Sequence, residues 1–208
     1  MGIFHSSLLH LFKMAIIVVK DITGRTLAMY YIACFGDSLI EGFPFGSDYS
    51  WIRQLESSGE ITAYNYGLCG DCTDDIFDRM RYRPLPEQVK HILYLGGAND
   101  IIQGVPERFT VANVAKVVNW CEEKGYKLCL VLPFVSGDEV LNRKLLNLRQ
   151  EYEHHFKDKA FILDLQPAIG TTAALRKKAY LDTVHPTLAT YKAMGEYSLP
   201  ILLQWVKS

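Results

Sequence analysis

This chain of 208 residues contains a serine, an aspartate and a histidine that together can carry out acyl transfer, with the serine far from the other two in the sequence. Ser38 follows Gly36-Asp37, while Asp182 and His185 lie near the other end of the chain. A serine hydroxyl is a poor nucleophile at its own pKa and must pass its proton to a base, and histidine is the side chain that titrates near neutrality. Asp182, three residues before His185, lies close enough in a turn to accept the second ring N–H and set the tautomer. The pattern indicates a nucleophile, a base and an orienting acid.

Each of these motifs also has a purely structural interpretation. Gly36-Asp37-Ser38 is a common turn sequence in which Asp37 or Ser38 caps the next helix. A histidine before Pro186 is typical of a loop, and Asp182 could be a helix cap. The chemical interpretation therefore depends on the groups that follow the other strands.

The elements that would position these residues form an α/β pattern. From Met29 onward, short apolar runs alternate with helical patterns, which is typical of βαβ units and a mainly parallel sheet. Strands are predicted at residues 30–35, 61–66, 91–95, 127–132 and 160–165. Helices are predicted from apolar period and capping residues at 49–57, 73–81, 110–124, 138–156 and 187–206. In such sheets, ligands bind outside the carboxyl ends of the strands.

Polar and glycine-rich segments follow the second and third predicted strands. Gly67-Leu68-Cys69-Gly70-Asp71-Cys72-Thr73 has two glycines that free backbone N–H groups to approach a ligand. Gly96-Gly97-Ala98-Asn99-Asp100 follows the next strand. In a parallel sheet these segments share one rim with Ser38, and the chain after the last strand can bring His185 there. Asp37 and Asp100 are predicted to be structural, holding their own turns.

This set of motifs, in this order, resembles the SGNH (GDSL) family of serine hydrolases, and the match covers the chain from Met29 onward. Each of the family's four sequence blocks has a counterpart: Gly36-Asp37-Ser38-Leu39, Asn65-x-Gly67-x-x-Gly70-Asp71-x-Thr73, Gly97-x-Asn99-Asp100 and Asp182-x-x-His185-Pro186. The departures are the cysteines Cys69 and Cys72 and the long N-terminal lead. Neither departure touches a position that the resemblance makes catalytic.

The resemblance implies a three-layer α/β/α, flavodoxin-like sandwich with a central five-stranded, mainly parallel sheet. It implies that Ser38 is the nucleophile, His185 the base and Asp182 its orienting acid. It also implies an oxyanion hole made by the backbone N–H groups of Ser38 and Gly67 and by the side-chain amide of Asn99.

The function expected from the resemblance is that of a serine esterase of the lipolytic GDSL type. Such an enzyme would hydrolyse carboxylic esters or thioesters of small molecules through an acyl-Ser38 intermediate, with no metal or cofactor. The alternatives are a carbohydrate O-acetylesterase of the same fold and a non-catalytic binding protein on the same scaffold. Phe43, Pro44 and Phe45 follow the serine and either line an acyl pocket or pack under the first helix.

Composition is that of an ordinary globular protein, with 49% hydrophobic and 22% charged residues and a net charge of -1. This charge gives no electrostatic support for a nucleic-acid or anionic-membrane partner. The number of cysteines, five, is odd, which favours a reducing compartment. Cys69-x-x-Cys72 has no second Cys or His pair at metal-site spacing, so no metal is expected. Oligomeric state is left open.

Residues 1–28 are predicted to be an N-terminal extension of uncertain structure, and residues 29–208 a single catalytic domain. The runs at 16–19 and 25–29 flank Thr23-Gly24, which is the pattern of an extra β-hairpin; the alternative is that Met29, directly before the first core strand, is the true start, and the sequence leaves both open. The apolar run at 14–19 is too short to span a bilayer. Lys20-Asp21 lies where a signal peptide would have its cleavage site, so a cytoplasmic location is expected and secretion stays open.

Overall fold

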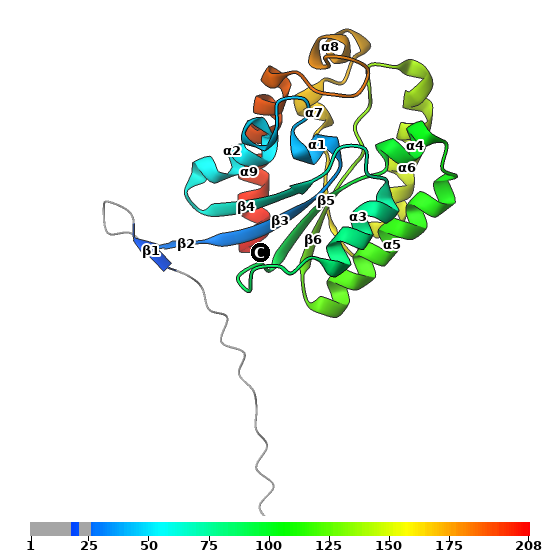
Figure 1. Ribbon diagram of the computed structural model, residues 1–208. Helices are drawn as coiled ribbons and strands as arrows, with labels where there is room; N and C mark the ends of the chain where they lie inside the picture. The colour runs from blue at the N-terminus through cyan, green and yellow to red at the C-terminus, as the bar shows by residue number, and fades with distance from the viewer. Residues whose placement is uncertain (1–17, 21–25) are drawn as a thin grey trace, which may run out of the picture.

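A five-stranded, all-parallel sheet forms the centre of the protein (Figure 1). The computed structural model describes residues 18–20 and 26–208. The strand order is β4-β3-β5-β6-β7. The strands are β3 (Tyr30–Gly36), β4 (Ile61–Gly67), β5 (His91–Leu95), β6 (Lys127–Val131) and β7 (Phe161–Leu163). All five predicted strands are confirmed; the bounds of β5 are as predicted, and those of the other strands differ from the prediction by at most two residues at either end.

The strand order has a reversal point next to β3. The chain runs from β3 outward to β4 and then returns across β3 to β5, after which β6 and β7 follow on that side. In doubly wound sheets, the crevice at the carboxyl ends of the strands on either side of such a reversal is where ligands bind. Ser38 is two residues after the end of β3 and therefore lies at this crevice.

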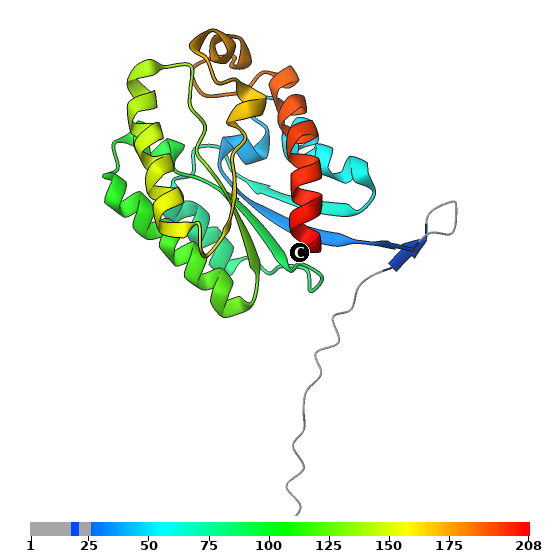
Figure 2. The same ribbon diagram turned by 180° about the vertical axis from the view of Figure 1, so that it is seen from behind.

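Helices cover both faces of the sheet, so the fold is the predicted three-layer α/β/α sandwich (Figures 1 and 2). Alternate residues of β3 point to opposite faces, as the period of a strand requires: Ile32 and Cys34 join one core cluster, while Ala33 and Phe35 join the other. One face packs against α2 (Trp51–Gln54), α7 (Gln166–Ile169) and α9 (Leu188–Lys207). The other packs against α3 (Thr73–Tyr82), α5 (Glu107–Lys124) and α6 (Glu139–Phe156).

The long helices are where their apolar period and capping residues predict them. The side chains of Asp138 and Thr187 accept backbone N–H groups at the starts of α6 and α9, as N-cap residues do. The predicted helix at 49–57 is divided into η1 (Ser47–Tyr49), α2 and η2 (Leu55–Ser58). Four short helices were not predicted, because a helix of four to seven residues contains too few apolar positions to show a period: α1 (Ser38–Glu41), α4 (Ala98–Gln103), α7 and α8 (Ala173–Ala179).

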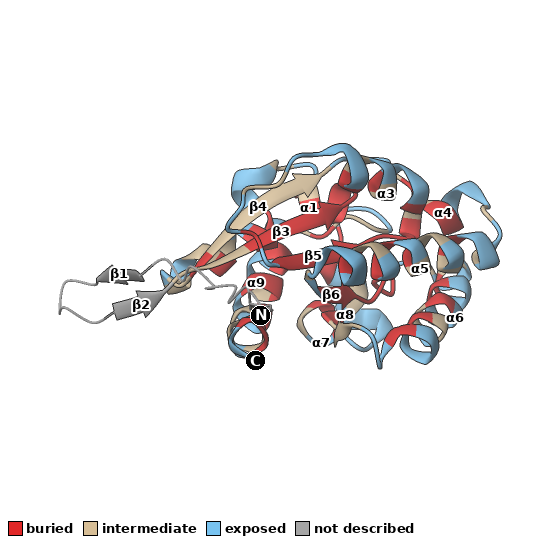
Figure 3. Ribbon diagram, turned by 90° about the horizontal axis from the view of Figure 1, so that it is seen from below, coloured by how far each residue is buried: buried red, intermediate tan, exposed pale blue. Residues whose placement is uncertain are grey.

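Burial follows the layers (Figure 3). The inner strands β3, β5 and β6 are almost wholly buried, whereas β4, at the edge of the sheet, is only half-buried along most of its length. In the described part of the chain, no helix is long and apolar enough to cross a membrane.

Two short strands precede the main sheet. β1 (Val18–Lys20) and β2 (Thr26–Ala28) pair antiparallel, in agreement with the hairpin expected on either side of Thr23-Gly24. The remainder of the predicted 1–28 extension lies outside the described residues.

Candidate active site

Ser38 is the first residue of the short helix α1, and only Asp37 separates it from the end of β3. The Asp37 side chain caps this helix, since its Oδ1 accepts the N–H of Leu39 at 2.9 Å. The structural interpretation of Asp37 is therefore confirmed. Ser38 is 5% exposed, so only a small part of it faces the solvent at the rim of the sheet.

Side chains from two other elements hold the far end of α1. The carbonyl oxygen of Ile40 accepts the hydroxyl of Ser50 and the side-chain amide of Asn65, both at 2.7 Å. The carbonyl of Leu39 accepts the indole N–H of Trp51 at 3.0 Å. These bonds satisfy backbone groups that a one-turn helix cannot satisfy itself. They give Ser38 a defined position.

Asp37 is fully buried beside the serine, and burial raises the pKa of its carboxyl to about 7. The hydrogen bond from Leu39 works in the opposite direction, but the nearby carboxylates of Asp100 and Asp71 add to the effect of burial. A buried carboxylate without a cation beside it favours its protonated form. Either form can accept the capping bond.

His185 lies against Ser38 although 147 residues separate them in the chain. Its Nε2 is 3.1 Å from Ser38 Oγ, and its Nδ1 is 2.8 Å from Asp182 Oδ2. The structure therefore brings together the serine, histidine and aspartate predicted from the sequence. A serine hydroxyl within hydrogen-bond reach of an imidazole, whose other nitrogen faces a carboxylate, is the arrangement that activates serine as a nucleophile.

Asp182 is held by backbone as well as by the imidazole. Its Oδ1 accepts the N–H groups of Val184 and His185 at 2.7 and 2.8 Å, which leaves Oδ2 for the ring. Partial burial acts to raise the pKa of Asp182, but the bonds from His185 and Val184 outweigh it and hold the pKa below its usual value. The carboxylate is therefore charged at neutral pH.

The loop that carries these two residues, Leu181–Pro186, is closed on itself and fastened to its neighbours. Leu181 N–H donates to His185 O at 2.8 Å, and Gly137 N–H donates to Thr183 O at 2.8 Å. Gly137 belongs to the segment after β6. The hydroxyl of Tyr180, the residue before the loop, donates to Val135 O of the same segment at 2.7 Å.

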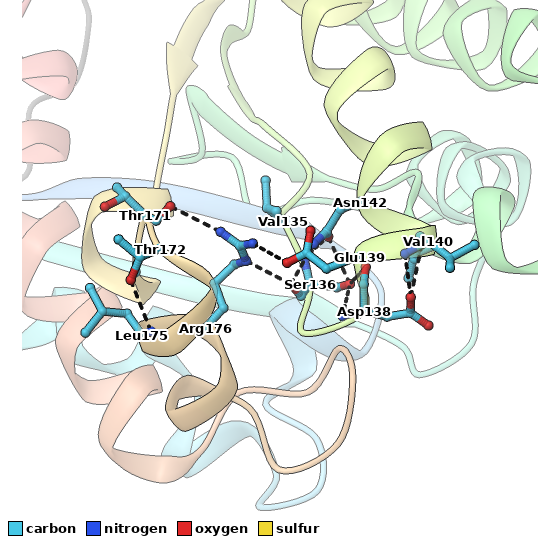
Figure 4. A network of polar contacts seen from close by, with 12 residues as sticks. Val135, Ser136, Asp138, Glu139, Val140, Asn142, Thr171, Thr172, Leu175 and Arg176 are labelled. Carbon is cyan, nitrogen blue, oxygen red and sulfur yellow. Dashed lines mark hydrogen bonds and ion pairs between the residues drawn. The ribbon is translucent and has the colours of Figure 1, made fainter.

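The segment after β6 is in turn held by a polar network (Figure 4). Arg176 of α8 donates to Ser136 O at 3.1 Å, to Thr171 O at 3.1 Å and to Glu139 Oε1 at 2.7 Å. The Asn142 side chain of α6 both donates to and accepts from Ser136. Two helices thus support the segment on which the Asp182 loop rests.

The loop after β4, Gly67–Thr73, is the second predicted part of the site, and it requires a correction. Gly67 N–H is not free, because it donates to the Asn65 side chain at 2.9 Å. Every other backbone N–H group of this loop also donates a hydrogen bond within the described residues, with the exception of Gly70. Gly67 has a packing role instead, since a Cβ there would overlap the Glu41 backbone of α1.

Asn99 lies at the start of α4, where its side-chain amide faces this loop. Its Nδ2 donates to Asp71 O at 2.9 Å, which uses one of the two amide hydrogens. Asp100 is fully buried and accepts both the N–H and the hydroxyl of Thr73, at 2.9 and 2.5 Å. Asp100 is therefore structural, as predicted. Asn99 and the Gly67–Thr73 loop are held against each other.

The sequence reasoning missed one residue of this region, Arg79. Its guanidinium contacts the ends of β3 and β4 and the carboxylate of Asp71. In the sequence, Arg79 is one of several charged residues on an amphipathic helix, and nothing in that pattern separates it from a solvated arginine. The cysteines of Cys69-x-x-Cys72 are both free thiols in the structure.

Comparison with solved structures shows what the fold resembles. A protein assigned to the lipolytic G-D-S-L family from Desulfitobacterium hafniense DCB-2 superposes with a TM-score of 0.75 at 22% identity, over 82% of this chain and 98% of that one. A member of the same family from Veillonella parvula DSM 2008 gives 0.73 at 18% identity, over 84% and 99%. The acetylxylan esterase Axe2 from Geobacillus stearothermophilus gives 0.67 at 17% identity, over 86% and 94%.

The sequence itself was compared with family models and with curated proteins. No curated protein matches it. The model described as GDSL-like Lipase/Acylhydrolase family matches residues 34–193, a range that includes Ser38, Asn99, Asp182 and His185. This range is more than half of the chain, so the resemblance seen in the sequence motifs is confirmed. The chain belongs to the GDSL-like lipase/acylhydrolase family.

Proposed function

We propose that the protein is a serine esterase that hydrolyses carboxylic esters or thioesters of small molecules through an acyl-Ser38 intermediate. The observation that carries the proposal is the chain of contacts from Ser38 Oγ through His185 to Asp182, at 3.1 and 2.8 Å. Membership of a family of lipases and acylhydrolases supports the same reaction class.

In the proposed acylation step, Ser38 Oγ attacks the carbonyl carbon while His185 Nε2 takes its proton. Asp182 accepts the Nδ1 proton, which keeps Nε2 free to act as a base and stabilises the imidazolium that forms. His185 then gives its proton to the leaving alcohol or thiol. In deacylation, a water molecule repeats the sequence and releases the acid, which restores Ser38.

The oxyanion of the tetrahedral intermediate needs donors that are not already used. We propose the N–H of Gly70 in place of that of Gly67, because the Gly67 N–H is bonded to Asn65. The second amide hydrogen of Asn99 and the N–H of Ser38, in the first turn of α1, complete the set. One such donor is typically worth roughly a hundred- to a thousandfold in rate.

The side chains around Ser38 at the edge of the sheet favour a substrate with an apolar acyl group. The Phe43 ring packs on the His185 ring with their centroids 4.7 Å apart, yet Phe43 is 40% exposed. Leu68 and Leu181, on the two loops of the site, are also about half-exposed. Exposed apolar side chains around a polar site favour contact with a hydrocarbon chain. A strict preference for acetyl esters over octanoyl esters would instead support the carbohydrate O-acetylesterase.

Within this proposal, residues 29–208 form one catalytic domain. The family match and both core clusters lie inside that range. We also propose a cytoplasmic location, because all five cysteines are free thiols and burial raises the pKa of Cys34 and Cys129, which keeps those two protonated and inert. Fractionation of expressing cells checks this location.

Ser38→Ala tests the mechanism. We expect this variant to lose hydrolysis of p-nitrophenyl butyrate and labelling by a fluorophosphonate probe, with thermal unfolding unchanged. Ser47→Ala, at an exposed serine of η1, is the matched control and should keep both activities. Full activity in Ser38→Ala would reject the acyl-Ser38 mechanism. A wild-type protein that the probe does not label would support the binding-protein alternative.

A further inference from the structure

Arg79 lies on α3, but its guanidinium binds outside that helix. Nη2 donates to Gly36 O at 2.9 Å and Nη1 donates to Tyr66 O at 2.8 Å. Nε donates to Asp71 Oδ2 at 2.6 Å. One planar group therefore joins the end of β3, the end of β4 and the loop that follows β4.

These three partners lie beside the nucleophile Ser38 and in or next to the Gly67–Thr73 loop, the two parts of the proposed site that Arg79 joins. Gly36 is two residues before Ser38, and Asp71 follows Gly70 directly. Asp71 is bound from two sides, because its carboxylate accepts Arg79 while its carbonyl accepts the amide of Asn99 at 2.9 Å. A shift of Asp71 would therefore move the Gly70 N–H and the Asn99 amide relative to Ser38.

We propose that Arg79 is a positioning residue that holds the Gly67–Thr73 loop and Asn99 at the distance from Ser38 that oxyanion stabilisation requires. The inference rests on the serine-esterase function proposed above. Arg79 touches neither the serine nor a bound substrate in this account, and acts through Asp71 and the carbonyls of Gly36 and Tyr66.

Arg81, two residues along the same helix, shows what an ordinary surface arginine does here. Its partner is Asp78, three residues away on α3, and the side chains of this pair are 41% and 63% exposed. Arg79 and Asp71 are 25% and 12% exposed, and the three acceptors of the Arg79 guanidinium all lie outside α3. Exposed pairs contribute little to stability, whereas a half-buried fork with three fixed acceptors sets geometry.

Lysine cannot reproduce these contacts. An ammonium group is a point charge, and it lacks the planar fork that reaches a carboxylate and two separate carbonyls. Arg79→Lys should therefore keep much of the attraction to Asp71 while losing the bonds to Gly36 and Tyr66. Arg79→Gln removes the charge as well. The two variants separate the effect of charge from the effect of geometry.

The test is steady-state hydrolysis of p-nitrophenyl butyrate by wild type, Arg79→Lys, Arg79→Gln and Arg81→Gln, with active enzyme counted by fluorophosphonate titration. Displacement of catalytic groups by about 1 Å can cost on the order of a hundredfold in rate. We therefore expect kcat per active site to fall on the order of ten- to a hundredfold in both Arg79 variants, with KM within about twofold of wild type. The pH at half-maximal kcat should not change, because the acceptors of the Arg79 guanidinium, Asp71, Tyr66 and Gly36, all lie outside the Asp182 loop.

Arg81→Gln should match wild type in kcat and KM. A wild-type kcat per active site in Arg79→Lys would overturn the proposal. The proposal would also fail if the activity lost in Arg79→Gln were fully explained by a smaller number of active sites in the fluorophosphonate titration. If Arg79→Gln does not fold, Arg79→Lys decides by the same criterion. These outcomes are separate from failure of the proposed function, which would appear as wild-type activity in Ser38→Ala or as no ester hydrolysis by wild type.

Discussion

Asp182 shows how one side chain can serve two purposes at the residue scale. One oxygen accepts two backbone N–H groups and so shapes its own loop, while the other faces the ring of His185. The first set of contacts favours the charged form but does not require it, because an amide oxygen can also accept. The second depends on an acceptor that makes Nδ1 carry the proton.

Asp182→Asn should therefore separate folding from catalysis. The asparagine oxygen keeps the backbone bonds, but its NH₂ group faces Nδ1 and favours the tautomer with the proton on Nε2, which cannot accept from Ser38. We expect kcat for p-nitrophenyl butyrate to fall roughly 10⁴-fold with a thermal midpoint close to wild type. Asp48→Asn, at an exposed position of η1, is the control. Unchanged kcat in Asp182→Asn would contradict the role assigned to the carboxylate.

Sequence motifs predict most of the site residues, but they do not show which backbone N–H groups are free. The types and order of Ser38, Asp182 and His185 predict a nucleophile, an orienting acid and a base, and the structure places these three side chains in contact. Asn99 is predicted as a donor by the family resemblance. Gly67 was predicted as a donor from its place in a motif. Whether an N–H is free depends on the acceptors around it. The acceptor of the Gly67 N–H, Asn65 Oδ1, belongs to the same motif, but the fold orients that side chain, since its Nδ2 donates to Ile40 O.

At the scale of elements, α1 and β4 pack at a distance that only a glycine allows. A Cβ at Gly67 would overlap the backbone of Glu41 at the end of α1. The same contact region includes the bond from Asn65 Nδ2 to Ile40 O. The one-turn helix that begins with Ser38 thus depends on the edge strand for its position.

Gly67→Ala should therefore destabilise the fold, because backbone atoms on both sides must move apart. We expect a loss of about 1–3 kcal/mol in the free energy of unfolding, the usual cost of overpacking, measured by urea denaturation. Gly137→Ala is the matched control, since a Cβ there would have its nearest neighbours at 3.6–3.8 Å, an ordinary contact distance. Equal unfolding curves for Gly67→Ala and Gly137→Ala would show that α1 and β4 can separate without cost.

At the scale of the whole molecule, the two ends of the sheet differ in character. The carboxyl ends of the strands carry the polar site, while the amino end of β5 carries His91 between the rings of Tyr30 and Trp205. His91 is buried, and neither ring nitrogen has a partner among the described residues. Burial, with a smaller effect from the charge of Lys127, lowers the pKa of His91 to about 4.

This depressed pKa predicts acid sensitivity. In the unfolded chain, His91 takes up a proton near pH 6.5, whereas in the folded protein it does so only near pH 4. The unfolded state therefore binds more protons between these values, and stability falls as the pH falls from about 6.5 to 4. His91→Phe keeps the ring contacts and should flatten this dependence, as measured by thermal midpoint against pH.

The pH dependence of stability must be compared between His91→Phe and wild type, because Asp37 affects it in the opposite direction to His91. Its pKa is raised to about 7 in the folded protein, so its contribution increases as the pH falls from 7 towards the value of an unfolded aspartate. His154→Gln is the control, because it removes an exposed histidine of α6 and so shows the effect of losing a histidine that is not buried. A pH dependence of His91→Phe identical to that of wild type would contradict the assignment.

The sequence by itself determined the five strands, the long helices and the residue types of the site. These features are local: a strand or a long helix repeats its apolar period, and the reactive residues follow the strand ends. Because parallel strands end on one rim, even the neighbourhood of Ser38 and Asn99 followed from order along the chain.

Only the tertiary structure decided which groups are already occupied. Gly67 and Gly70 are three residues apart in one motif, yet Asn65 takes the N–H of the first and leaves the second without a partner among the described residues. Arg79 and Arg81 lie on one helix, yet only Arg79 reaches three fixed acceptors. A donor binds the acceptor that lies nearest in space. For the Gly67 N–H this acceptor is two residues away, whereas the Arg79 guanidinium reaches the carbonyl of Gly36, 43 residues away, which only the folded chain brings close.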